Sequence, residues 1–171
     1  WKFIELLQQL KREGKEVVWV MGNHDDFARH FFKSIGIKAK NQYSFEWEGK
    51  KCLALHGHQF DKFLIQNRIM ATTMNRSYRM IQKMDKTKRK VTRFVKTRYK
   101  VWLRVSSRVS KKAIRYATLK RLDYVFCGHT HEKLAMKLGK VHYLNSGSWA
   151  DRPCHYVILK DGQAKIGTLE V

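Results

Sequence analysis

Hydrophobic and polar positions divide the first part of the chain into helical and extended segments. Apolar residues recur every three or four positions between residues 1 and 12, and Gly14 follows them, so a helix is predicted there. Residues 17–21 are continuously apolar, which is typical of a strand buried on both faces. A second, short helix is predicted over residues 27–34, ending near Gly36.

A β-hairpin and several later strands are predicted in the same way. Residues 43–47 alternate between aromatic and polar side chains, residues 48–49 are predicted to turn, and residues 51–55 form the second strand. Further extended segments are predicted at residues 124–127, 141–144, 156–159 and 164–171, the last two as a closing hairpin. The predicted strands therefore lie on either side of a long middle segment.

That middle segment is predicted to be helical and strongly basic. Residues 60–121 lack Pro and Gly, and their apolar positions recur every three, four or seven residues, so two or more amphipathic helices are expected, broken near residues 86–89. The whole chain carries 36 Lys and Arg against 14 Asp and Glu, a net charge of +22. Residues 61–121 hold 20 of these basic residues and only 2 acidic ones. Such an excess indicates an anionic partner, either nucleic acid or an anionic membrane face, although a solvated cationic helix face is the plainer interpretation.

Composition narrows the class of protein. A chain of 171 residues with 43% hydrophobic content is expected to form one globular domain. No apolar stretch approaches the roughly 18–20 residues that span a bilayer, and no leader pattern is present. The three cysteines, Cys52, Cys127 and Cys154, are odd in number and lack CxxC spacing, which indicates free thiols in a reducing compartment. A cytoplasmic protein is therefore expected.

Four polar loops that follow apolar segments carry the candidate chemistry. They are Gly22-Asn23-His24-Asp25, His56-Gly57-His58, Gly128-His129-Thr130-His131 and Asn145-Ser146-Gly147-Ser148-Trp149. Asn and neutral imidazole groups are ligands of borderline divalent metals, and strand ends are where sites form in α/β sheets. Each loop alone is a weak signal, because a lone His is more often a hydrogen-bonded bystander. His30, His142 and His155 are interpreted in that way.

The order of the four loops resembles that of the calcineurin-like metallophosphoesterases, a superfamily of two-metal hydrolases. Within it, the chain is particularly similar to the group that includes UDP-2,3-diacylglucosamine pyrophosphohydrolase, including its long helical insertion between the second and third loops. The resemblance implies an α/β fold in which an α/β/β/α sandwich, residues 1–59 and 122–171, carries a helical insertion at residues 60–121. It also implies hydrolysis of a phosphoester or pyrophosphate bond.

The resemblance further implies a metal site. Asn23, His56 and His129 would bind one divalent ion, Asn23 would also contact the substrate phosphate, and His131 would bind a second ion. Two such ions clamp a phosphoryl group and lower the pKa of a bridging water. Manganese is the expected metal, and a site of this kind also accepts iron, zinc or cobalt.

Three other residues are implied to act beside the metals. His24 would protonate or stabilise the leaving-group oxygen, and Asp25 would orient its imidazole. His58 is expected to orient a ligand or to be structural.

Two features depart from the family pattern. The DxH and GDxxD loops, which supply most ligands of one metal, do not occur in these 171 residues. The sandwich is therefore expected to lack its first strands, and an N-terminal segment in cis or a separate chain would complete it. The chain also opens on Trp1 rather than Met. The pyrophosphohydrolase itself has Arg at the position of His24, so a relative with another leaving group fits equally well.

In lipid-processing members of the family, the inserted helices form a lid over the acyl chains of the substrate. Met70, Met74 and Trp102 would contact the substrate here, because Met side chains adapt to irregular apolar ligands. The implied substrate is a phosphorylated amphiphile such as UDP-2,3-diacylglucosamine or a relative. The implied location is the cytoplasm, peripheral on the inner face of the cytoplasmic membrane. The alternative for the apolar stripe is the insertion's own core.

Two other function classes fit the same sequence. A soluble phosphodiesterase or nuclease would use the basic insertion to bind nucleic-acid phosphates, with interleaved aromatic residues stacking on bases. A non-catalytic binding scaffold is expected if the chain is native as written, because too few ligands remain for two dications.

Overall fold

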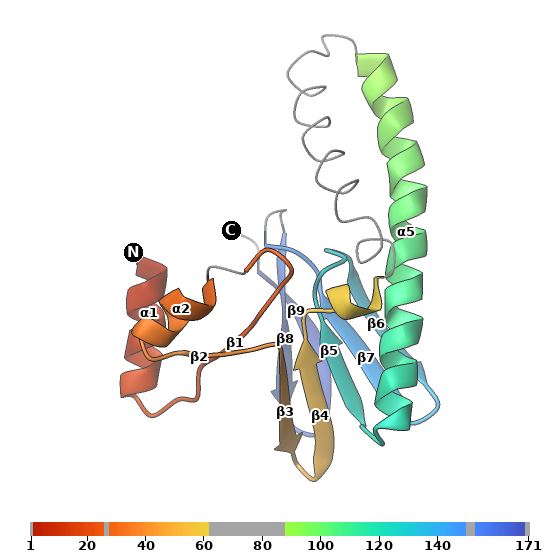
Figure 1. The fold of residues 1–171 in the computed structure, drawn as a ribbon. Coiled ribbons are helices and arrows are strands. Elements are labelled where there is room, and N and C mark those ends of the chain that lie inside the picture. Colours follow the sequence, from red (N-terminus) through yellow and green to blue (C-terminus); the bar gives the residue numbers. More distant parts are fainter. Residues whose placement is uncertain (1, 26–27, 62–87, 150–152, 170–171) are drawn as a thin grey trace.

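The computed structural model describes residues 2–25, 28–61, 88–149 and 153–169, and of residues 88–102 it describes the backbone alone (Figure 1). In chain order, the elements are α1 (Lys2–Arg12), β1 (Val18–Val20), α2 (Ala28–Ser34), β2 (Lys38–Lys40), β3 (Gln42–Trp47), β4 (Lys50–Leu55), the 3₁₀ turn η1 (His58–Phe60), α5 (Lys88–Leu119), β5 (Tyr124–Cys127), β6 (Lys133–Leu138), β7 (Val141–Ser146), β8 (Cys154–Lys160) and β9 (Gln163–Leu169).

The main sheet has five strands in the order β3-β4-β5-β7-β6. The three central strands, β4, β5 and β7, run parallel, whereas the outer strands β3 and β6 are antiparallel to their neighbours. The carboxyl ends of the parallel strands therefore meet at one edge of the sheet. The loops that begin at His56, Gly128 and Gly147 leave the sheet at this edge, which we call the loop edge.

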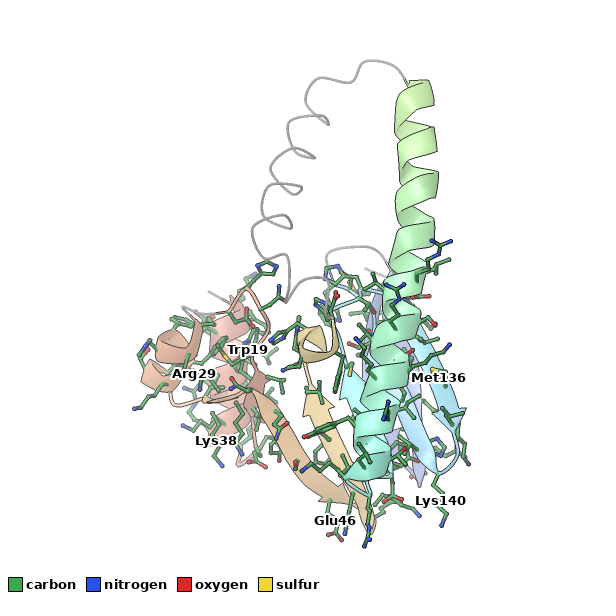
Figure 2. The ribbon with its side chains drawn as sticks, turned by 45° about the vertical axis from the view of Figure 1, so that its right-hand side comes forward. Trp19, Arg29, Lys38, Glu46, Met136 and Lys140 are labelled. Carbon is green, nitrogen blue, oxygen red and sulfur yellow. The ribbon has the colours of Figure 1, made fainter. Side chains whose placement is uncertain are left out.

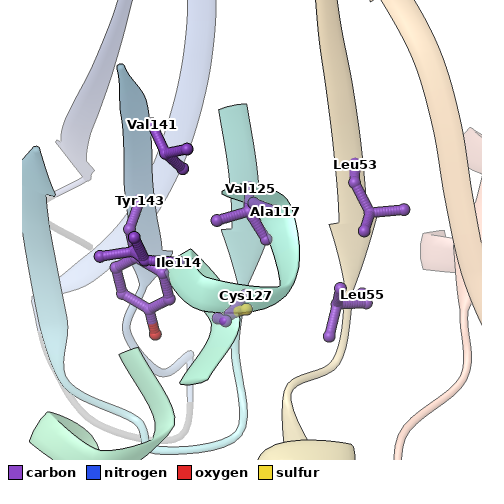
Figure 3. Packing of buried hydrophobic residues seen from close by; sticks show 9 residues of the cluster. Leu53, Leu55, Ile114, Ala117, Val125, Cys127, Val141 and Tyr143 are labelled. Carbon is purple, nitrogen blue, oxygen red and sulfur yellow. The ribbon is translucent and has the colours of Figure 1, made fainter. Parts of the chain in front are cut away.

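One face of the main sheet is covered by the second half of α5. Ala113, Ile114 and Ala117 are almost fully buried, and they pack with Leu53 and Tyr143 in one apolar cluster (Figure 3). The described part of the predicted insertion therefore contributes to the core of the sheet.

The opposite face of the main sheet is covered by the β8–β9 hairpin. Cys52, Tyr124 and Leu144 of the sheet pack there against Val157 and Ile166. Helix, sheet and hairpin form three layers of a mixed α/β fold, as expected.

The first part of the chain forms a smaller unit beside the main sheet, with β1 paired in parallel to β2 and flanked by α1 and α2 (Figure 1). Trp19 of β1 stacks on Phe32 of α2 with their ring centroids 4.1 Å apart. Trp19 lies on this unit, and Met136 lies on the far edge strand β6 (Figure 2). The prediction of a strand buried on both faces over residues 17–21 is wrong for β1. Its three residues are only half-buried, because within the described chain it pairs with a single strand.

Most other predicted elements are confirmed, and two strands were not predicted. The helix at 2–12, the 43–55 hairpin and the closing hairpin all form. The unpredicted strands are β2, which has only three residues and pairs with β1, and β6, which pairs with β7. The signal available for β6 was the alternation of Leu134, Met136 and Leu138 along it. All three cysteines are buried and free, as expected. Residues 62–87, which hold Met70 and Met74, lie outside the described residues.

None of the helices among the described residues combines the length and the apolar character that a membrane-crossing helix needs.

Removing the side chain that α5 inserts into the sheet is expected to destabilise the fold. Ile114 is 1% exposed, so Ile114→Ala should lower the free energy of unfolding by about 2–5 kcal/mol. The neighbouring exposed change Arg115→Ala should alter it by less than about 0.5 kcal/mol. Urea denaturation of both variants measures the difference, and equal effects would contradict the packing of α5 on the sheet.

Candidate active site

The loop edge brings together all four loops singled out in the sequence, the fourth through Asn145, which donates to the Gly128 carbonyl. The rings of His56, after β4, and His129, after β5, have centroids 5.1 Å apart. The loop after β1 also reaches this place, because a Cβ built on Gly22 would stand 3.0 Å from the His56 ring. Parallel pairing of β4 with β5 puts the two histidines on adjacent strands, and β1 supplies the third side from the smaller unit.

Each of the two histidines has one ring nitrogen held by a neighbour. Nδ1 of His56 lies 3.1 Å from Nδ1 of His58, and Nε2 of His129 lies 3.1 Å from Oδ2 of Asp61. The other ring nitrogen of each makes no hydrogen bond with the described residues. Metal-ligating histidines have this arrangement, in which one nitrogen is fixed by a neighbour and the other is left for the metal.

Asp61 was not identified as a candidate from the sequence. Its side chain and that of His129 are each 8% exposed, so this pair is largely removed from solvent. Asp61 follows directly after η1, and its backbone N–H donates to the His58 carbonyl. The available signal was its charge, because Asp61 is one of only two acidic residues in the basic segment 61–121.

The environment keeps these imidazoles neutral. Burial lowers the pKa of His56 to about 4, and the nearby His129 and His58 rings act in the same direction, while the Asp25 carboxylate opposes them. Burial also lowers the pKa of His129, against the hydrogen bond and charge of Asp61. Because only a neutral imidazole has a free lone pair, both rings are in the form that binds a metal at neutral pH.

The third loop holds two non-glycine residues in a left-handed backbone conformation. The φ angle is +65° at His129 and +54° at His131. This region costs about 1–2 kcal/mol for a residue with a side chain, so the surrounding contacts must hold the loop in place. The strain lies at the two histidines that the family resemblance assigns to the metals.

The hydrogen bonds of Asp25 go to groups other than His24, and its role in orienting the His24 ring stays a prediction. Oδ2 of Asp25 accepts from the Gly22 N–H at 2.8 Å and from the Trp19 indole N–H at 3.1 Å. The carboxylate is used to close its own turn, whose N–H groups need an acceptor. His24 is exposed, and its Nε2 lies 3.1 Å from Nδ2 of Asn23.

The remaining candidate residues lie on the third loop and on α5. His131 is exposed on the third loop, and Trp102 lies on α5, where only the backbone is described. Of the histidines interpreted as bystanders, His142 stacks on Tyr124 and Nδ1 of His155 lies 3.1 Å from Oγ1 of Thr168.

The donor set fits part of a metal shell. Neutral imidazoles and the Asn23 amide suit a borderline divalent ion. However, no three His, Cys, Asp or Glu side chains within the described ranges stand close enough together to enclose an ion. The nearby carboxylates are already engaged, Asp25 with Trp19 and Gly22, and Asp61 with His129. The residues thus fit a metal in donor type, and the described chain does not complete its shell.

The buried position of His56 predicts an unusual titration. Its ring should titrate at about pH 4 by NMR, far below the ordinary value of about 6.5. The His56 ring takes up its proton at about pH 6.5 in the unfolded chain, but only near pH 4 in the folded chain. The free energy of unfolding should therefore fall as the pH is lowered across this range, and His56→Asn should flatten that slope. A ring that titrates near 6.5 would contradict the buried placement.

Several solved structures are similar to this chain in fold. An archaeal phosphodiesterase has a TM-score of 0.52 and 15% identity, over 97% of this chain and 74% of that one. An uncharacterized protein from Streptococcus pneumoniae, described as a predicted phosphoesterase, has a TM-score of 0.41 and 15% identity, over 96% of this chain and 90% of that one. Vacuolar protein sorting 29 from Cryptosporidium parvum has a TM-score of 0.41 and 14% identity, over 99% and 75%. The archaeal structure supports the likeness in fold.

No curated protein matches the chain in sequence. The profile of the calcineurin-like phosphoesterase superfamily domain, in contrast, matches residues 2–161, nearly the whole chain. The chain therefore belongs to the calcineurin-like phosphoesterase superfamily.

Proposed function

We propose that the complete protein hydrolyses a phosphoester or pyrophosphate bond with the help of divalent metal ions. Membership of the phosphoesterase superfamily supports hydrolysis in general. The observation that carries the proposal is the pair of neutral rings, His56 and His129, which lie 5.1 Å apart with one nitrogen of each fixed. Two basic nitrogens held in this way at the carboxyl ends of parallel strands suit a bound cation better than they suit a hydrophobic core.

The chain's own residues divide into binding and orienting groups. Asn23, His56 and His129 would hold one ion and His131 would hold a second, with Asn23 also facing the phosphate. Bound ions of this kind stabilise the charge on the phosphoryl oxygens and lower the pKa of water, and manganese is the metal we propose first. His58 and Asp61 fix the rings of His56 and His129. His24, which is exposed on its loop, would donate a proton to the leaving oxygen.

The remaining ligands are proposed to come from a segment outside these 171 residues, in cis or as a separate chain. The smaller unit has surfaces that such a segment would cover. Helix α1 has no buried residue, and its Phe3 and Leu6 are 56% and 50% exposed. Strand β1 pairs on one side with β2, and no second neighbour is found among the described strands. Apolar and edge surfaces of this type are usually covered in a native protein.

The substrate is proposed to be a nucleotide-linked lipid, such as UDP-2,3-diacylglucosamine or a relative, taken from the inner face of the cytoplasmic membrane. Its support is the cationic stripe, which we define as Arg104, Arg108, Lys111 and Arg115. All four are exposed, and their spacing puts them on one side of α5, opposite its buried face. Among the described residues, none of the four forms an ion pair. An unpaired stripe of cations is drawn to anionic headgroups.

The same stripe supports a second candidate, a soluble phosphodiesterase or nuclease. Four cations on successive helical turns would also contact a run of nucleic-acid phosphates. The exposed arc that holds the stripe presents no aromatic side chain for base stacking in the described part of α5, which favours backbone contacts.

Loss of the carboxylate behind His129 should impair metal-dependent hydrolysis. With the natural protein, manganese and bis(p-nitrophenyl) phosphate, Asp61→Asn should reduce activity or metal affinity about 10–100-fold, because a neutral amide replaces the charged acceptor of the His129 ring. His129→Ala should reduce activity further. Asp161→Asn, in the exposed β8–β9 turn, is the matched control and should retain wild-type activity. A fully active Asp61→Asn protein would contradict the arrangement.

Neutralising the cationic stripe separates the two candidate functions. The variant with Arg104, Arg108, Lys111 and Arg115 changed to Gln should lose binding to vesicles that contain phosphatidylserine. Each cation contributes about 1 kcal/mol at such a surface, so about 100-fold or more is expected. A control with Lys50, Lys140, Lys160 and Lys165 changed to Gln has the same net charge and should bind as before. If the stripe instead supports gel shifts of DNA, with a salt slope that falls by about 0.9 per lost contact, the nuclease candidate is favoured.

A further inference from the structure

The turn that presents His129 is closed by a single short hydrogen bond. The N–H of Thr130 donates to the carbonyl of Gly128 at 2.7 Å, and His129 between them has a φ of +65°. A three-residue turn with positive φ at its centre is the rare and strained form of the γ-turn. Such a conformation persists only where its surroundings over-determine it.

Asn145, at the end of β7, makes contacts on both sides of this turn. Its Nδ2 lies 2.6 Å from the Gly128 carbonyl and 3.0 Å from Oγ1 of Thr130. Its Oδ1 accepts from the Gly147 N–H at 3.0 Å, which fixes the orientation of the amide. Asn145 has no exposed surface, so these bonds form away from competing water.

The chain of contacts continues into α5. Thr130 is 1% exposed, and its Oγ1 lies 3.4 Å from Oγ of Ser106, which is also 1% exposed. Three fully buried polar side chains, from β7, the third loop and α5, therefore meet directly behind His129. Buried polar groups are costly unless they are satisfied, and the interior of a helix–sheet interface is ordinarily apolar.

We infer that Asn145 and Thr130 are positioning residues that hold His129 in its strained turn, and that Ser106 couples this turn to α5. The inference rests on the proposed function in one respect, the role of His129 as a site residue. It assigns the buried polar cluster a task beyond packing. An apolar core would hold the sheet and helix together equally well, but it would offer no acceptor or donor to fix the turn.

A positioning role and a purely packing role of this cluster predict different results for two variants of Thr130. Thr130→Val keeps the shape of the side chain and removes the hydroxyl, whereas Thr130→Ser keeps the hydroxyl and removes the methyl group. If the hydroxyl positions His129, the Val variant changes the site and the Ser variant restores it. If the cluster only packs, the Ser variant is the more damaging because it leaves a small cavity.

The experiment uses the natural protein and two measurements. Long-range ¹H–¹⁵N NMR at fixed pH reports which nitrogen of His129 carries the proton, and hydrolysis of bis(p-nitrophenyl) phosphate with manganese gives kcat and KM. For Thr130→Val we expect a changed His129 ring pattern and a kcat about 10–100-fold lower with little change in KM. Thr130→Ser should match the wild-type ring pattern and have a kcat within about threefold of wild type.

A third variant keeps the test decisive if Thr130→Val does not fold. Ser106→Ala leaves the bonds between Asn145 and Thr130 intact and should give a smaller change of the same kind in the His129 pattern. An unchanged His129 pattern in both Thr130→Val and Ser106→Ala would overturn the inference. A wild-type protein that hydrolyses no phosphodiester would instead count against the proposed function, and the ring pattern would still decide the positioning role.

Discussion

The parallel pairing of β4, β5 and β7 is the constraint on which the rest of the structure depends. Cys52 lies opposite Tyr124, and Cys127 lies opposite Asn145, so the three strands end almost level. Parallel strands need long connections, and here α5 lies between β4 and β5 in sequence and covers the sheet face that they share. The same pairing that buries the apolar core therefore brings polar loops from distant parts of the chain to one edge.

Partial burial of these loops sets their chemistry. His56 and His129 lie deep enough for desolvation to keep them neutral, and each has one nitrogen fixed by a neighbouring side chain. Neutral rings need no counter-charge, so the edge tolerates several histidines in close contact. Among the described residues, the two carboxylates near these rings, Asp25 and Asp61, are both hydrogen-bonded to neighbouring groups.

Helix α5 has two faces with different tasks. Its buried face combines apolar residues such as Ile114 with the polar Ser106, which reaches the turn at His129. Its opposite face presents the cationic stripe to solvent. The same helix therefore contacts the turn at His129 with one face and carries the exposed cations on the other.

Periodicity and loop order in the sequence by themselves determined the main elements, the α/β class and the identity of the loops that hold His56 and His129. They did so because alternation and helical spacing record which face of an element is buried. They did not predict β2 or β6, the half-exposed state of β1, or the partner of Asp25. Only the tertiary structure paired Asp61 with His129, 68 residues away, and Asn145 with Gly128. Strand register and turn geometry decide which group comes within hydrogen-bonding distance of a buried side chain. Neither of the two can be read from the pattern of apolar residues.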